Sequence, residues 1–294
     1  MNELRRTENA EVSTTEAMAL EMAGNEPRVP APGYLHPLSI LLRRYTHAYT
    51  NCHDFEVCRQ LMTEDYTLRM GENVFRGREL HYIPATEKQF RQYPGLGITV
   101  HDVVVGTDRI AMSFSEHGRS TLTGKSSRWS GVSMYRWDGR RLTECRVEQD
   151  YHARREQMRT GHPEQLPQPA LDPWTTEPLA PEPRTERVLR EWLAGGGLFE
   201  APIGSLDNEP TAMPRRVLLS CASVTVLDLF TAGPRAAFHI RVQGRYAGGI
   251  GIDDYRNRPV EVYATGLATV AGESVSIQAV TDRLAVERRL LHGA

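Results

Sequence analysis

The sequence predicts an α+β protein made of two related domains. In the first half of the chain, helical patterns come first and strand patterns follow, an order typical of the α+β class. The strand pattern of this half then recurs in the second half, which indicates an internal duplication. A proline-rich stretch separates the two halves, and 294 residues are enough for two domains of ordinary size.

The domain boundaries follow from changes in composition. Residues 1–35 are polar and end in closely spaced prolines, so we predict a flexible N-terminal tail. Residues 161–184 are rich in proline, which excludes helix and central strand and predicts a semi-extended linker. The first domain is therefore expected at residues 36–160 and the second at residues 185–294.

Three helices and a set of strands are expected in the first domain. Apolar residues recur at helical spacing over 38–51, and Asp54 is placed to cap a second helix. A third helical stretch covers 78–93, where Pro84 predicts a kink or a restart. A strand, turn and strand precede that third stretch, and everything after it alternates as strands divided by short turns.

The duplication is visible as an ungapped match. ITVHDVVVGTDRIAMSFSEHGR (98–119) aligns with VTVLDLFTAGPRAAFHIRVQGR (224–245), and the shared polar positions include Asp102 with Asp228 and Arg109 with Arg235. Arg119 likewise recurs, as Arg245. The second copy has one clear helix, and Pro202, Pro210 and Pro214 break the segment after it. We therefore expect a degenerate second copy with fewer helices.

Composition and motifs argue against several functions. The formal net charge of −2 gives no electrostatic reason to expect a nucleic-acid partner. No apolar run approaches the length of a membrane span, the N-terminus lacks a signal-peptide pattern, and four unpaired-looking cysteines suit a reducing compartment, so we expect a cytoplasmic protein. HExxH, paired CxxC and nucleotide-binding glycine motifs are all missing, so we expect neither a metal nor a cofactor.

The first half resembles the SnoaL-like branch of the nuclear-transport-factor-2-like superfamily. The resemblance rests on the turn at residues 51–54, on HDVVVGTDRIAMSFSEHGR and on WDGRRLTECRVEQDYHARREQM. It covers roughly residues 38–158 well and 185–291 weakly. It implies cone-shaped domains, in which helices pack on a curved antiparallel sheet around an apolar pocket. The superfamily includes polyketide cyclases, ketosteroid isomerases, dehydratases, epoxide hydrolases and non-catalytic binding modules, so the fold alone leaves the function open.

The last strand of the first copy carries the main catalytic candidates. Glu144, Arg146, Glu148 and Asp150 share one face by the period of two. One interpretation is a charged face turned to solvent or to a domain interface. The other is that the strand end enters the cone, with Asp150 as the acid/base and Glu148 beside it. The resemblance favours Asp150, because SnoaL-like enzymes use an aspartate at what looks like the matching place.

Two residues on a neighbouring strand complete the predicted catalytic set. His117 and Arg119 lie two apart and share a face, and an arginine beside a carboxylate would keep it ionised. The alternative for Arg119 is an ordinary salt bridge. In the second copy Thr281 and Arg283 align with Glu148 and Asp150, so we expect activity in the first copy only.

Several further side chains are candidates for lining the pocket. A tyrosine on the first helix could donate to a carbonyl or enolate oxygen, although such residues are more often aromatics at the edge of a core. The predicted substrate-binding residues are Tyr45, Tyr49, Tyr66, Arg69, Trp129 and Arg146.

These expectations lead to one main function hypothesis and to alternatives of other classes. The main hypothesis is a cofactor-independent acid/base enzyme, a cyclase, isomerase, dehydratase or hydrolase. Its substrate would be a mostly apolar small molecule, such as a polyketide-like or terpenoid-like intermediate of bacterial specialised metabolism. The alternative is a non-catalytic module that binds a small molecule or a protein, a self-resistance protein included. In either case the fused copies would form an intramolecular pseudo-dimer, with a homodimer as a further option.

Overall fold

A computed structural model describes residues 35–163, 166–200, 203–207 and 216–292. Apart from Leu35, the predicted N-terminal tail lies outside the described residues, as do Pro202, Pro210 and Pro214. The chain divides into the units Met1–Leu35 and His36–Ala294, and the second unit contains both predicted domains.

The helices of the first domain form where the apolar spacing predicts them. The first runs as α2 (Pro37–Arg44) and continues as a π-helical turn, η2 (Tyr45–Thr50). Asp54 caps α3 (Phe55–Leu61), because its Oδ1 accepts the Glu56 and Val57 N–H groups. The third helical stretch restarts at the proline, as η3 (Arg78–Tyr82) followed by α4 (Ile83–Gln92).

Six strands make the sheet of the first domain, in the spatial order β2-β1-β6-β5-β4-β3. They are β1 (Met62–Met70), β2 (Asn73–Arg76), β3 (Gly97–Val105), β4 (Arg109–Arg119), β5 (Ser126–Trp137) and β6 (Leu142–Gln149). The expected antiparallel sheet is in fact mixed, because β1 pairs parallel with β6. This pairing brings the N-terminal hairpin beside the last strand.

The second domain repeats this topology without the hairpin strand. Its sheet has the order β7-β11-β10-β9-β8, and β7 again pairs parallel with the last strand. Its strands are β7 (Ile203–Leu206), β8 (Leu218–Ala232), β9 (Arg235–Gly248), β10 (Pro259–Ala271) and β11 (Ser274–Thr281). A register shift lies between Val100 and Asp102 in the first sheet and between Val226 and Asp228 in the second. Those positions are equivalent in the sequence match. The two copies therefore share even this irregularity in strand pairing, which confirms the duplication.

Each sheet is followed by a helix that the strand pattern did not predict. These helices are α5 (Tyr151–Thr160) and α8 (Arg283–His292). Asp150 ends β6 and caps α5, since its Oδ1 accepts the Ala153 N–H at 3.0 Å. The expectation that only strands and turns follow the third helical stretch of the first domain is therefore wrong.

The linker region follows the surface of the first domain. The N–H groups of Ala170 and Leu179 donate to the carbonyls of Val100 and Val105 on β3, and Trp174 is buried. The chain then enters α6 (Pro183–Ala194) and the short α7 (Gly197–Glu200). We keep the domain limits 36–160 and 185–294, with residues 161–184 between them, as a proposal.

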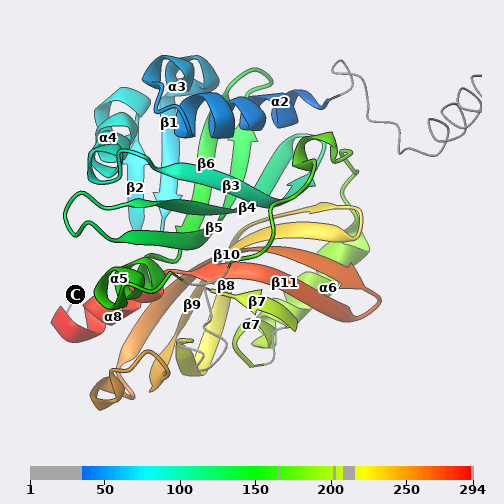
Figure 1. Cartoon of the computed structure of the whole chain (residues 1–294). Helices are drawn as coiled ribbons and strands as arrows, with labels where there is room; N and C mark the ends of the chain where they lie inside the picture. Colours follow the sequence, from blue (N-terminus) through cyan, green and yellow to red (C-terminus); the bar gives the residue numbers. More distant parts are fainter. Residues whose placement is uncertain (1–34, 164–165, 201–202, 208–215, 293–294) are drawn as a thin grey trace, which may run out of the picture. The chain divides into compact units, whose positions relative to one another are not determined.

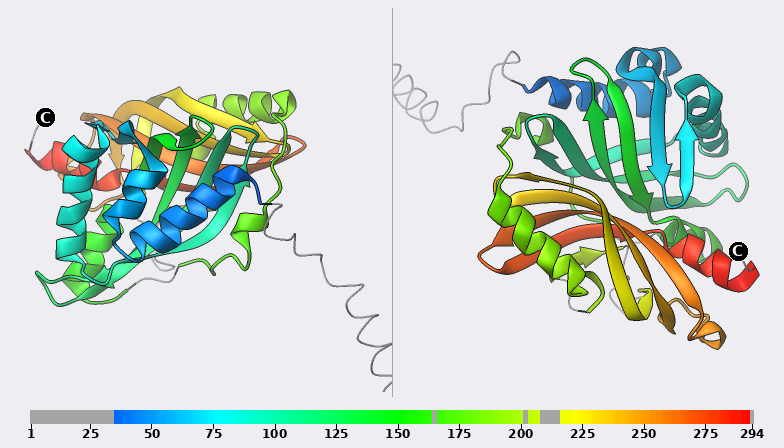
Figure 2. Two further views of the ribbon diagram at one scale, coloured as in Figure 1. Left: turned by 90° about the horizontal axis from the view of Figure 1, so that it is seen from above. Right: turned by 180° about the vertical axis from the view of Figure 1, so that it is seen from behind.

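The two sheets pack face to face, with α5 and α8 side by side at one edge of their contact and the other long helices on the outer faces (Figures 1 and 2). In Figure 1, α2, α3 and α4 cover the outer face of the first sheet, and α6 covers that of the second. The contact between the sheets has its own apolar core, formed by Val104, Ala111, Val132, Met134, Phe230, Ala232, Ala237, Leu267 and Val280. Each domain therefore has two buried faces, one toward its helices and one toward the other domain.

Equivalent residues of the two copies make reciprocal ion pairs across this contact. The Arg109 guanidinium donates to Asp228 Oδ1 at 2.8 Å, and the Arg235 guanidinium donates to Asp102 Oδ1 at 2.9 Å. Such an exchange is what a two-fold interface between identical subunits produces. These polar residues, retained in both copies, are thus interface residues.

Candidate active site

A cavity of about 190 Å³ lies between the helices and the sheet of the first domain. We call it the cone cavity. Aromatic and aliphatic side chains make most of its wall, among them Phe90, Met112, Phe114, Tyr135 and Val147. A polar group placed in such a wall is largely removed from water, and its pKa shifts accordingly.

Glu116 is the carboxyl group of this cavity. It lies on β4 and is 8% exposed. Its Oε2 accepts a hydrogen bond from Gln89 Nε2 at 2.7 Å, and its Oε1 accepts one from Gln149 Nε2 at 3.5 Å. Burial raises the pKa of Glu116 to about 7, although the Arg154 charge and the two amides act in the opposite direction. Near neutral pH this carboxyl group therefore exists in both its acid and its base form.

Tyrosine hydroxyl groups are the other polar atoms of the wall. The hydroxyls of Tyr45 and Tyr82 lie 3.4 Å apart, and the Tyr45 ring contacts those of Tyr49 and Tyr135 edge-on. Burial raises the pKa of Tyr45, so the phenol stays protonated and can donate a hydrogen bond. The π-helical turns η2 and η3 carry Tyr45, Tyr49 and Tyr82, and such turns are frequent at functional sites.

The cavity also contains a thiol, Cys145 on β6. Burial raises its pKa to about 12, which leaves the thiol protonated at neutral pH. It is therefore a poor nucleophile, and Glu116 is the titrating group of the cavity wall near pH 7.

The structure places part of the predicted substrate-binding set at this cavity. Tyr45 and Tyr49 lie in its wall. Tyr66 is buried in the core, where its ring packs edge-on against Tyr82, and it is not part of the wall. Trp129 is also fully buried, and its Nε1 donates to Gln149 Oε1 at 2.7 Å. Trp129 thus orients the amide that faces Glu116.

The remaining two predicted binding residues face the other domain. Arg69 pairs with Glu144, at 3.5 Å. Arg146 pairs with Glu144 at 2.7 Å and with Asp228 of the second domain at 3.2 Å. The prediction that they line the cavity is wrong. The apolar face of β6, which carries Cys145 and Val147, lies toward the helices and the cavity, so Arg146 lies on the opposite face.

Asp150 and Glu148 do not enter the cone cavity either. Asp150 is fully buried against the second domain, where Arg283 Nε donates to its Oδ1 at 2.9 Å. Glu148 Oε1 accepts the Gly71 N–H at 2.8 Å, and the Asp282 carboxyl lies close enough to raise its pKa. Of the two interpretations of the charged face, the interface is correct. In the alignment of the two copies, Arg283 occupies the position of Asp150. In the structure these two equivalent residues form an ion pair with each other.

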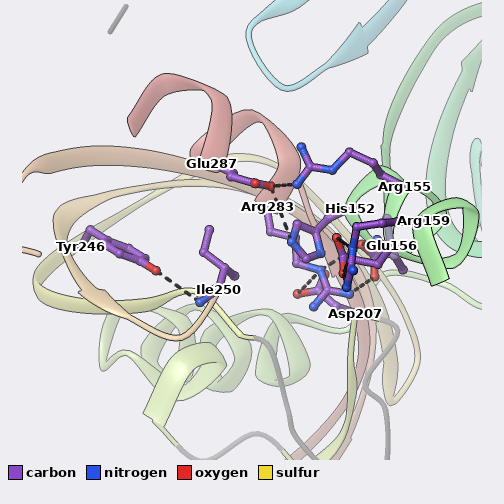
Figure 3. A network of polar contacts seen from close by, with 11 residues as sticks. His152, Arg155, Glu156, Arg159, Asp207, Tyr246, Ile250, Arg283 and Glu287 are labelled. Carbon is purple, nitrogen blue, oxygen red and sulfur yellow. Dashed lines mark hydrogen bonds and ion pairs between the residues drawn. The ribbon is translucent and has the colours of Figure 1, made fainter. Parts of the chain in front are cut away.

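Figure 3 shows the polar network around this pair. Asp207 lies within 4.0 Å of the Arg283 Nε, and burial raises the pKa of Asp207 to about 7. On the other side Glu287 of α8 pairs with Arg155 of α5 and lies 3.6 Å from His152 Nε2. Burial lowers the pKa of His152 to about 4, so this histidine is neutral at pH 7. The network joins α5 to α8 and holds the domains together.

His117 and Arg119 lie at the far end of β4, and both are exposed. The Arg119 Nε donates to the Gly124 carbonyl at 2.8 Å, and Arg245 in the second copy makes a similar bond to the Asn257 carbonyl. His117 faces Gly97 on the neighbouring strand. The expectation that they accompany Asp150 in one pocket is wrong, because the face they share points away from the cavity.

The sequence did contain a signal for Glu116. Ile110, Met112 and Phe114 occupy alternate positions of β4 and are buried, and Glu116 continues the same series. An acid that continues an apolar stripe at a period of two must enter the core. His117, the residue predicted from this strand together with Arg119, belongs to the opposite face.

The first domain packs its helices on one face of a sheet around an apolar cavity, which is the architecture of the nuclear-transport-factor-2-like fold. Residues 42–145 match the family model of the SnoaL-like domain, and they form such a domain. Comparison with curated proteins gives no match.

Solved structures of three bacterial proteins show similarity to this domain. Wild-type IdmH from Streptomyces antibioticus, described as a candidate polyketide cyclase, is 19% identical (TM-score 0.39; 42% of this chain, 99% of that chain). A candidate SnoaL-like polyketide cyclase from Jannaschia sp. CCS1 is 16% identical (TM-score 0.39; 51% and 99%). A candidate polyketide cyclase from Acidithiobacillus ferrooxidans is 20% identical (TM-score 0.39; 43% and 97%).

Two further properties of the described residues bear on other functions. No group of three or more histidine, cysteine, aspartate or glutamate side chains in this part of the chain is placed to hold a metal ion. None of its helices is both long and apolar enough to cross a membrane.

Proposed function

We propose that the first domain is a cofactor-independent acid/base site for a small, mostly apolar molecule, with Glu116 as the base. The reaction class is proton abstraction next to a carbonyl group, which leads to isomerisation or cyclisation of the substrate. Polyketide-like or terpenoid-like intermediates of bacterial specialised metabolism have this chemistry. The second domain serves as an intramolecular pseudo-dimer partner.

One observation carries this proposal, namely a single buried carboxyl group with a pKa of about 7 in an apolar cavity. A base works best when its pKa is close to the working pH, because enough of it is then ionised and it still binds a proton well. Burial supplies this condition, as it does for other carboxyl bases in hydrophobic pockets.

The cavity also holds groups that suit the rest of the reaction. The amides of Gln89 and Gln149 fix the Glu116 carboxylate through its two oxygens. When the base takes a proton from carbon, negative charge develops on the neighbouring carbonyl oxygen. The hydroxyls of Tyr45 and Tyr82 are neutral donors that could stabilise that oxyanion.

The test uses a general proton-abstraction probe, since the natural substrate is unidentified. Ring opening of 5-nitrobenzisoxazole requires only a base and is followed by absorbance. We expect the full chain to accelerate this reaction, and Glu116→Gln to lower its rate roughly 10²-fold, which is the scale of general-base catalysis. The amide replaces the carboxylate with little change in volume, so the cavity is retained.

Glu87→Gln on α4 is the matched control, because this glutamate pairs with Arg91 on the surface. It should keep the native rate. Equal rates for the native chain and Glu116→Gln would contradict the assignment of the base. Binding of the probe without any turnover would favour the alternative class, a non-catalytic binding module.

A further inference from the structure

A second cavity, of about 410 Å³, lies where the two domains meet. We call it the junction cavity. The first domain supplies the turn after β1, the end of β6 and the first turn of α5, and the second domain supplies the start of α8. Neither domain alone encloses it, so it depends on the packing of the two domains against each other.

Three arginines face this cavity, Arg154, Arg288 and Arg289. Arg289 is already paired, with Glu72 and with Asp282. Within the described part of the chain, Arg154 and Arg288 make no ion pair with a carboxylate. Two guanidinium groups are therefore available to an anionic ligand.

The acidic groups of the wall oppose this positive charge only in part. Burial raises the pKa of Glu148 well above its ordinary value, and the nearby Asp282 charge raises it further. Burial also raises the pKa of Asp282, to about 7. Burial therefore disfavours the negative charge of these two carboxyl groups. Arg289 pairs with Glu72 and Asp282, which leaves the guanidinium groups of Arg154 and Arg288 as the other positive groups of the wall.

Arg154 is held in place before any ligand arrives. Its guanidinium carbon lies 4.2 Å from the centre of the Tyr151 ring and 5.0 Å from that of Trp129. A guanidinium that is already immobilised loses little conformational entropy on binding, which favours affinity.

The rest of the wall is apolar and comes from Met70, Leu284, Ala285 and the Tyr151 ring. We propose that the junction cavity binds an organic carboxylate, with the carboxylate between Arg154 and Arg288 and the apolar part against Met70 and Leu284. The ligand class is an aromatic or aliphatic acid. The wall of this site is distinct from that of the Glu116 site except for Met70, Gln149 and Tyr151, which line both cavities.

The test measures binding of 2-naphthoate to the full chain by isothermal titration calorimetry. The neutral 2-naphthalenemethanol has almost the same shape and should bind at least about tenfold more weakly. Arg288→Gln should weaken naphthoate binding about tenfold, which is the worth of one charge-assisted hydrogen bond, and Arg288→Lys should restore most of it. Ala285→Trp should abolish binding by filling the cavity.

Arg187→Gln on α6 is the matched control, because it removes an exposed arginine far from the cavity. It should bind naphthoate like the native chain. Arg288 is exposed, so its variants should fold normally, and far-UV circular dichroism checks this. Native affinity in Arg288→Gln, or equal affinity for the neutral analogue, would overturn the proposal.

Discussion

At the scale of single residues, burial decides which carboxyl group acts as a base. The chain has 37 aspartates and glutamates, and most of those at the surface or in ion pairs stay ionised. Asp228 is a contrasting case. Burial alone would raise its pKa, but hydrogen bonds from Arg109 and the charges of three arginines hold that pKa below its ordinary value. Glu116 accepts hydrogen bonds from amides, and only the charge of Arg154 acts on it from further away, so for this residue the effect of burial prevails.

The raised pKa of Glu116 has a consequence for stability. Its pKa is 4.5 in its ordinary state and about 7 in the folded protein, so the folded chain holds the proton more tightly than the unfolded chain does. The stability contributed by the protonated group is complete below about pH 4.5 and is lost as the pH rises through about 7. Ionisation of Glu116, which the proposed reaction needs, therefore lowers the free energy of unfolding at neutral pH.

This cost can be measured by comparing Glu116→Gln with the native chain in urea. From about pH 5 to about pH 8, the variant should gain stability relative to the native chain by roughly 3 kcal/mol, an order-of-magnitude value for such a pKa shift. Taking the difference removes the contributions of His152, His239 and the interface carboxyl groups. A difference in unfolding free energy that does not change with pH would contradict the raised pKa.

At the scale of elements, both sheets contain the same close contact between neighbouring strands. Phe114 on β4 pairs in register with Gly131 on β5, and Phe238 on β9 pairs with Gly266 on β10. A Cβ atom at either glycine would lie 2.4 Å from the Cζ of the opposite phenylalanine. The phenyl ring thus occupies the space that a side chain would need, and Phe114 is at the same time part of the cavity wall.

Gly131→Ala should therefore destabilise the first domain, by roughly 1–3 kcal/mol, as expected for overpacking of a core. It should also move the Phe114 ring and disturb the cone cavity. The measurement is the urea midpoint of the full chain. Gly95→Ala is the control, because nothing lies within 4 Å of a Cβ at that turn. A midpoint for Gly131→Ala equal to that of the control would show that the ring moves aside at no cost.

At the scale of the whole molecule, the interface between the two copies contains two equivalent ion pairs that differ in how deeply they are buried. The Arg109–Asp228 pair has side chains 9% and 5% exposed, whereas the equivalent Arg235–Asp102 pair has 29% and 36%. Removing one partner of a buried pair leaves an uncompensated charge, which costs far more than the loss of a partly exposed pair.

This inequality predicts different effects for two identical substitutions. Asp228→Asn should lower the unfolding free energy by roughly 3–5 kcal/mol, because it leaves the buried Arg109 without its carboxylate. Asp102→Asn, at the equivalent position, should cost about 1 kcal/mol or less. Thermal and urea unfolding of both variants would compare them. Equal losses would mean that the burial of the pair has no influence on its energetic contribution.

Much of the fold could be predicted from the sequence, because its signals are local. Apolar spacing located α2 to α4, Asp54 marked the start of α3, and Pro84 marked the restart of the third helix. The ungapped match located the second sheet. The helices after β6 and β11 were missed, because the strand alternation was extended past Asp150, a residue that caps a helix.

The site was predicted less well, because its signals depend on which face of a strand meets which partner. Tyr45 and Tyr49 lie in the cavity wall, whereas Asp150, Glu148 and Arg146 face the second domain. In a single domain a strand face rich in charge usually meets solvent. Here both faces of the sheet are buried, so charged residues such as Arg109 and Asp150 are paired with partners 119 and 133 residues away in the chain.

The sequence by itself determined the α+β class and the duplication, because periodicity and repetition are properties of the chain alone, and its resemblance to a known family indicated the SnoaL-like character of the first domain. Only the tertiary structure decided that Glu116 points into the cone cavity and that Arg283 completes an ion pair with Asp150. Alternation divides a strand into two faces, but packing decides which face meets the helices and which meets the other copy. The environment met by each face then sets the pKa of its carboxyl groups.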